Sequence, residues 1–177
     1  LLGLVALRSY RQKQRDNQNL AFQKTIIEAK NKDITDSIKY AKRIQEAILP
    51  PETHWHTLLP NSFVYYRAKD ILSGDFYWIE ENEDAVFVAA VDCTGHGVPG
   101  ALMSIVGFNL LNKAVLEQNL QQPAEILNML NKWVTKSLRQ TIDDSSVRDG
   151  MDISLCRINK KTKELQWAGA FNPLYIV

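Results

Sequence analysis

Hydrophobic residues recur at intervals of seven along the first part of the chain. Between about Ser9 and Leu49 there is no proline or glycine, which favours one long helix. The apolar positions at this interval are Leu20, Ile27, Ile34, Ala41 and Ile48. Such a repeat is typical of a helix that packs on a partner helix, so residues 20–48 predict a parallel homodimer that is able to change register. For residues 38–49 a second interpretation stays open, in which the helix lies on its own domain.

Pro50 and Pro51 end this helix, because neither residue can donate a backbone hydrogen bond to it. After them the hydrophobic period changes from seven to two. Segments rich in Val, Tyr, Phe, Trp and Ile predict strands, and they span residues 62–70, 75–81, 85–92, 151–158 and 164–168. Two helices are expected between the third and fourth of these strands, beginning at Pro99 and Pro123.

This order of elements predicts the class of the fold. Hairpins of adjacent strands, with two consecutive helices between the hairpins, indicate an antiparallel sheet with helices stacked on its face, which is an α+β fold. The signalling helix would span residues 9–49 and the globular domain residues 50–177. Because the chain ends in an apolar run at residues 174–177, which would leave an unpaired strand edge, we expect further strands to follow.

Composition narrows the classes of partner. The 177 residues are 45% hydrophobic and 23% charged, with a net charge of +1, as in an ordinary globular domain. A near-neutral chain offers no broad basic surface for phosphate backbones, so no nucleic-acid partner is expected. The two cysteines, Cys93 and Cys156, lack the paired spacing of a zinc site or disulfide framework, which favours a reducing cytoplasm.

The first residues are apolar and are followed by a basic cluster at Arg8, Arg11, Lys13 and Arg15. Residues 1–8 are too short to cross a bilayer, which takes roughly 20 residues. They fit the cut end of a membrane helix with a positive-inside flank, which would place the rest on the cytoplasmic side of the inner membrane. Alternatively they are the frayed start of the long helix, and the protein is then simply cytoplasmic.

Two aspartates mark the ends of neighbouring predicted strands. If the turn between the strands centres on residues 83–84, the hairpin register sets Asp75 opposite Asp92, with Cβ atoms about 4.5–5.5 Å apart on one face. Like charges so placed repel, which leaves a shared proton or a bound divalent cation. A hard ion such as Mg²⁺ or Mn²⁺ suits carboxylates and carbonyls. If the register is off by one, both are ordinary turn residues.

The loop after Asp92 contains three glycines, Gly95, Gly97 and Gly100. At a strand-to-helix junction they allow the backbone to approach a ligand and to point amides at an anion such as phosphate. The loop is not a Walker loop, because the Lys-Ser/Thr pair is missing. It is not a tyrosine-phosphatase loop either, because Pro99 stands where that loop needs arginine. Cys93 is therefore interpreted as a small packing residue.

These segments together resemble the SpoIIE/RsbU branch of the PPM (type 2C) protein phosphatases. The resemblance spans about residues 38–177 and rests on the successive motifs at residues 73–78, 91–101 and 149–152, with a similar leading helix at 44–50. It implies a four-layer α/β/β/α sandwich of antiparallel sheets and a centre with two Mn²⁺ or Mg²⁺ ions. Asp75 and Asp92 would be metal ligands, with the backbone around Gly95 close by.

In such a centre the metals activate a water that attacks phosphorus. The resemblance implies a phosphorylated serine or threonine on a small anti-sigma-factor antagonist as substrate. His96 is a candidate proton donor to the leaving oxygen, or an ordinary surface imidazole. Asp152 is favoured over Asp149 as a further metal ligand, although Asp149 also fits a simple turn. Arg67, on an expected strand, is a candidate phosphate contact, or part of a solvated face.

The resemblance also implies further metal-binding aspartates downstream of residue 152, and the chain ends before them. The 177 residues by themselves would then hold an incomplete metal centre and be inactive. The competing hypothesis is a binding module, a phosphatase fold that recognises a phosphoprotein and is dimerised through its helix without turnover.

Overall fold

The computed structural model describes residues 2–138 and 149–177, and these form two compact units that divide after Tyr40. Helix α1, Leu2–Ile48, runs through the first unit and enters the second, so the predicted long helix is confirmed. Leu1, part of the segment expected to end a membrane helix, lies outside the described residues. On α1, Leu20, Ile27 and Ile34 are exposed, and their pairing with a second chain stays a prediction.

The last turns of α1 belong to the globular unit. Ile48 and Leu49 pack against its main core, and Gln45 is buried. Residues 41–49 therefore follow the second interpretation, in which the helix lies on its own domain. Pro50 and Pro51 then interrupt the backbone hydrogen bonding, and α1 ends at Ile48 as predicted.

One antiparallel sheet with strand order β1-β2-β3-β4 forms the centre of this unit. Its strands are β1 (Phe76–Glu81), β2 (Ala85–Cys93), β3 (Met151–Asn159) and β4 (Leu165–Ala170). The turn between β1 and β2 is closed by Asn82, whose Oδ1 accepts hydrogen bonds from the amides of Asp84 and Ala85. This tight turn fixes the hairpin register, and the ladder pairs Phe76 with Val91. The predicted register is the observed one.

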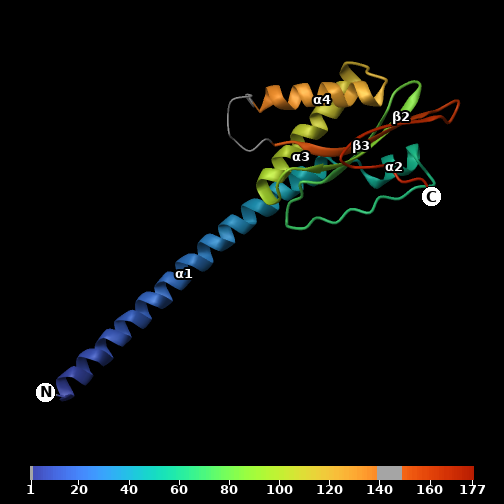
Figure 1. Cartoon of the computed structure of the whole chain (residues 1–177). Coiled ribbons are helices and arrows are strands. Elements are labelled where there is room, and N and C mark those ends of the chain that lie inside the picture. Colours follow the sequence, from blue (N-terminus) through green and yellow to red (C-terminus); the bar gives the residue numbers. More distant parts are fainter. Residues whose placement is uncertain (1, 139–148) are drawn as a thin grey trace. The chain divides into compact units, whose positions relative to one another are not determined.

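Helices cover one face of the sheet, as Figure 1 shows. They are α3 (Gly97–Asn112), the π-helical turn η1 (Lys113–Glu117) and α4 (Pro123–Ser137). The main core lies beneath them, and Trp78 is fully buried there with its indole N–H donating to Asn112 Oδ1 at 2.7 Å. Among the described residues, Gly97–Glu117 alone has the length and apolarity of a membrane span. Half of its apolar window is buried inside the domain, as expected for a core helix.

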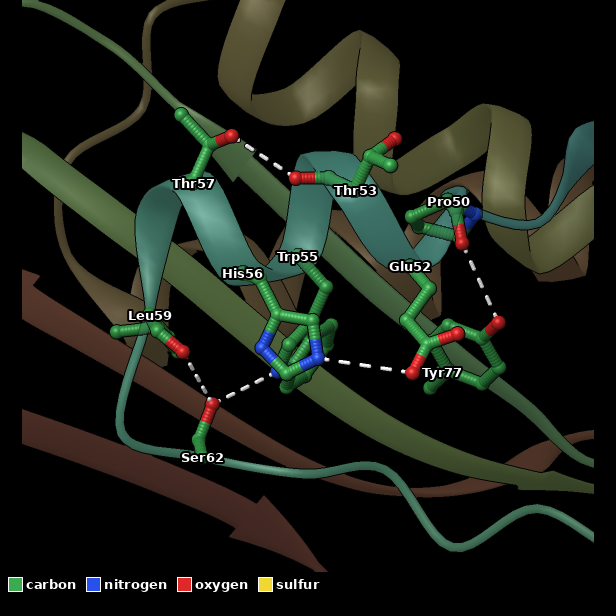
Figure 2. A network of polar contacts seen from close by, with 9 residues as sticks. All are labelled: Pro50, Glu52, Thr53, Trp55, His56, Thr57, Leu59, Ser62 and Tyr77. Carbon is green, nitrogen blue, oxygen red and sulfur yellow. Dashed lines mark hydrogen bonds and ion pairs between the residues drawn. The ribbon is translucent and has the colours of Figure 1, made fainter.

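The opposite face is partly covered by α2, Glu52–Leu58, which the sequence did not predict. A smaller core of Trp55, Ile79 and Val86 lies under it. Two hydrogen bonds hold α2 and the residues before it in place, as Figure 2 shows. The Tyr77 hydroxyl donates to the carbonyl of Pro50, just before α2, at 3.2 Å. The indole N–H of Trp55, within α2, donates to Ser62 Oγ at 2.8 Å.

The prediction of a strand at residues 62–70 is wrong. These residues form a loop with a bend at 69–70, and no strand of the described chain pairs with them. Their alternation reflects packing on the smaller core instead: Val64 contacts that core, while Phe63 and Tyr65 are exposed. The α+β class with an antiparallel sheet and a long N-terminal helix is confirmed. Of the four layers expected, the described residues supply one sheet and its helical cover.

Candidate metal centre

Three aspartates stand in one row across three strands. The β1–β2 register, continued by one residue from the Phe76–Val91 pair, sets Asp75 opposite Asp92. The β2–β3 ladder pairs Asp92 directly with Asp152. Directly opposed residues of antiparallel strands share a face, so the three carboxylates lie on the same face at one end of the sheet. All three are exposed.

The electrostatics of Asp75 show that it is close to Asp92. Burial raises the pKa of Asp75 above its usual value, and the hydrogen-bonding proximity and the charge of Asp92 raise this pKa further. The charge of Asp92 therefore opposes the ionisation of Asp75, which is the condition that a divalent cation between the two carboxylates would relieve.

Three glycines pack backbone to backbone beside this pair. A Cβ added at Gly74 would lie 2.7 Å from the carbonyl oxygen of Gly95, and one added at Gly100 would lie 2.5 Å from the same oxygen. Gly95 itself has a φ of 90°, a conformation that L side chains rarely adopt. The contact joins the segment before Asp75, the loop after Asp92 and the first turns of α3, so it holds the Gly95 carbonyl against the segment that carries Asp75.

His96 lies in the same loop with 75% of its side chain exposed. Its Nδ1 is 3.0 Å from Asp70 Oδ2. A bond from Nδ1–H to this carboxylate leaves Nε2 as the ring nitrogen that faces other partners. The start of β3 is tied to the loop as well, because Thr94 N–H donates to the Gly150 carbonyl at 3.0 Å.

An open cleft of about 500 Å³ lies over the sheet beside the carboxylates. Its lining includes both Asp75 and Asp92, and also Arg67, Tyr66 and Asn172. Of the described residues that line this cleft, only Arg67 carries a positive charge. Its side chain is exposed. Cys93, in contrast, faces the helices with 3% exposed, and burial followed by the nearby aspartate charges raises the pKa of its thiol to about 12.

The donors present suit a hard divalent cation. Carboxylates and a backbone carbonyl are the ligands of Mg²⁺ and Mn²⁺. No cluster of three or more His, Cys, Asp or Glu side chains within residues 2–138 and 149–177 converges tightly enough to hold an ion. The reason is geometric, since neighbouring strands are about 4.8 Å apart and the ends of a three-strand row are therefore about twice that distance apart. Asp152 stands next to Asp92, whereas Asp149 lies before β3 and is exposed.

Four residues that support the site were not predicted as part of it. Asp70 contacts His96, and Tyr66 donates from its hydroxyl to the Asp75 carbonyl at 3.2 Å. Ser73 Oγ accepts the Asp75 N–H at 3.1 Å, and Gln45 contacts Ser73 from α1. The sequence signal that pointed to Gln45 was its polar side chain, which lies within the apolar face at the end of α1. The contacts of Asp70 and Tyr66 depend on how the chain folds back on itself, which sequence spacing does not reveal. The contact of Ser73 with the amide two residues further on is local, and a serine in such a turn was its available signal.

The family model described as Stage II sporulation protein E (SpoIIE) matches residues 82–177, which is more than half of the chain. The chain belongs to the SpoIIE family. The SiaA-PP2C domain of Pseudomonas aeruginosa is a similar solved structure, with 34% sequence identity and a TM-score of 0.68. The match covers 79% of this chain and 55% of that domain.

Phosphoserine phosphatase RsbU of Bacillus subtilis (strain 168) is a further relative, 25% identical over 107 residues. That match covers 60% of this chain and 31% of RsbU, so the chain spans about a third to a half of the relatives it matches. These relatives confirm the resemblance to the SpoIIE/RsbU branch of the PP2C-type phosphatases. The matched SpoIIE region includes Asp92, the glycine loop and Asp152.

Proposed function

We propose that this member of the SpoIIE family acts, within its full-length protein, as a metal-dependent protein serine/threonine phosphatase. The observation that supports this most is the row of Asp75, Asp92 and Asp152 on one face of the sheet, beside the Gly95 loop. Two Mn²⁺ or Mg²⁺ ions bound there would activate water and neutralise charge on a phosphoryl group. Asp75 and Asp92 are the proposed principal ligands, with Asp152 and the Gly95 carbonyl completing the set.

Other residues of the site have roles in substrate handling. Arg67 lines the cleft that contains both carboxylates, and we assign it a contact with the substrate phosphate. His96, held at Nδ1 by Asp70, presents Nε2 as proton donor to the serine or threonine oxygen that leaves. Both groups would act on a phosphorylated side chain presented at the open end of the sheet.

The substrate is proposed to be a phosphorylated regulatory protein of the anti-sigma-factor-antagonist type. Support comes from the family, and from RsbU being named a phosphoserine phosphatase. Exposed Leu20, Ile27 and Ile34 at intervals of seven support a homodimer through the first part of residues 20–48, since Ile48 packs against the chain's own core. The apolar start of α1 and its basic flank support an upstream membrane anchor and a location on the cytoplasmic side of the inner membrane.

The test is manganese-dependent hydrolysis of para-nitrophenyl phosphate and of a phosphoserine protein by the full-length protein. Asp92→Asn should abolish turnover while the far-ultraviolet circular dichroism stays unchanged. Asp84→Asn is the matched control, because Asp84 is an exposed aspartate of the same hairpin at its opposite, turn end. Loss of activity in both variants, or in neither, would contradict the assignment of Asp92.

A binding module without turnover is the second candidate. It is favoured by the lack of three converging metal-binding side chains among residues 2–138 and 149–177. This candidate predicts that the full-length protein binds the phosphoprotein, but that manganese produces no hydrolysis even with wild-type residues.

A further inference from the structure

A second cleft, of about 450 Å³, lies between α4 and the strands β3 and β4. Its floor is apolar and includes Leu130, Val134 and Ile153, which also belong to the main core. Ile153 follows Asp152 in β3, and successive side chains of a strand point to opposite faces of the sheet. The cleft therefore lies on the helix-covered face, and the row of aspartates lies on the other.

One wall of this cleft is an edge strand. In the described part of the chain β4 pairs with β3 alone, so its outer side carries unpaired backbone N–H and C=O groups. Native edge strands are commonly protected by lysine, proline or a bulge, yet residues 165–170 contain neither a charged residue nor a proline. Where they line the cleft, Ala168, Gly169 and Ala170 have small side chains or none. An extended segment can add to such an edge as a further strand.

The other wall is one face of α4. Ala124, Asn128, Asn131 and Thr135 lie on one stripe of the helix, because they follow one another at intervals of three or four residues. All four line the cleft and are exposed. Neither Asn128 nor Asn131 forms a side-chain hydrogen bond with another described residue. Each carboxamide offers two donor hydrogens and an acceptor oxygen, which are the groups that pair with the backbone of a peptide.

Charge and length define what fits between these walls. Of the described residues that line the cleft, only Asp149 is charged. A lining with a negative charge and no cation disfavours acidic segments and phosphate groups. From Ala124 to Thr135 the helix rises by about 16 Å, which corresponds to about five residues of extended chain. The complementary ligand is therefore a short extended segment that is uncharged or basic.

We propose that this cleft binds an extended, uncharged or basic segment of a partner protein. The segment adds to β4 as a strand, and Asn128 and Asn131 bond its backbone from the side of α4. Apolar side chains at alternate positions fill the floor of the cleft, because alternate residues of a strand share a face. This interaction surface goes beyond the proposed phosphatase function and does not depend on it, since the aspartates occupy the opposite face of the sheet.

The test begins with random peptides of about seven residues, enough to span the cleft with a residue beyond each end. They are displayed on phage and selected against the full-length protein. Enriched peptides are synthesised with a fluorescein label and titrated by fluorescence anisotropy. We expect sequences with apolar residues at alternate positions and without Asp or Glu. Failure of any peptide to enrich, or enrichment of acidic peptides, would overturn the proposal.

The site is then assigned with a double variant, Asn128→Ala with Asn131→Ala. Loss of the two carboxamides should weaken peptide affinity by about tenfold. Both positions are exposed, so the variant should keep the wild-type circular dichroism. Asn109→Ala is the matched control, because Asn109 is an exposed asparagine of α3 outside the cleft lining. Equal affinities of the double variant and this control would show that the peptides bind elsewhere.

Two further measurements separate this proposal from other occupants and from the proposed function. Methylation of single backbone nitrogens of the peptide should abolish binding at alternate positions, and affinity that survives at every position would contradict strand addition. Peptide affinity should be the same in Mn²⁺ and in EDTA, whether or not the protein has turnover, and a loss in EDTA would place the peptide at the metal centre instead. Self-association that only the double variant loses would mean that a second copy occupies the cleft.

Discussion

Asp92→Asn should stabilise the metal-free protein, although it should abolish activity. The change removes one of two like charges that oppose each other across β1 and β2. Two unit charges at about 4 Å interact by about 1 kcal/mol in water and by about 4 kcal/mol at an effective dielectric constant of 20. Because both carboxylates are exposed, the lower figure applies, and the variant should gain about 1 kcal/mol.

The pH dependence of this gain has a definite sign. The folded protein raises the pKa of Asp75, through burial first and through Asp92 second. Between the unfolded and folded pKa values of Asp75 the native state binds more protons than the unfolded state, so stability falls as pH rises through this window. At pH values above the folded-state pKa of Asp75 this loss of stability is fully present, and at pH values below its unfolded-state pKa the loss is absent. The advantage of Asp92→Asn should therefore be complete at neutral pH and fade on the acid side of the window.

Thermal unfolding in the presence of EDTA measures the effect. For a domain of this size a gain of about 1 kcal/mol raises the melting temperature by about 2–5 °C. Manganese should reverse the order, because a ligand at about 100 times its dissociation constant stabilises the native state by about 2.7 kcal/mol, and under the proposed function only the wild-type pair would bind it well. A lower melting temperature for Asp92→Asn than for wild type in EDTA at neutral pH would refute the reasoning.

Two further outcomes are expected from the packing around the site. Gly100→Ala should destabilise the protein by about 1–3 kcal/mol in chemical denaturation, because the new Cβ would lie 2.5 Å from the Gly95 carbonyl oxygen, whereas Gly150→Ala, with no atom within 4 Å, should be close to neutral. Thiol labelling of the folded protein near neutral pH should persist in Cys93→Ser and disappear in Cys156→Ser, because the pKa of about 12 keeps the buried Cys93 thiol protonated; rapid labelling of Cys93 would contradict its buried position.

Much of the local structure follows from the sequence. The proline pair ended α1 where expected, and Asn82 with its neighbours set a tight turn whose register could be counted from the residues. Period-two hydrophobicity located four strands, because β1, β2 and β3 each bury one face under α3 and α4, and Ala170 of β4 packs against the same core. The same periodicity wrongly predicted a strand at residues 62–70, where the alternation comes from packing on the smaller core and not from pairing with a neighbouring strand.

For the centre, the sequence by itself determined the pairing of Asp75 with Asp92, because a hairpin register is a local property. Only the tertiary structure decided that Asp152 joins them, that Asp70 contacts His96 and that Gln45 holds Ser73, since these contacts join residues at least 26 positions apart. The physical reason is that side-chain spacing along one element follows from its backbone period, whereas the meeting of separate elements depends on how their buried faces pack.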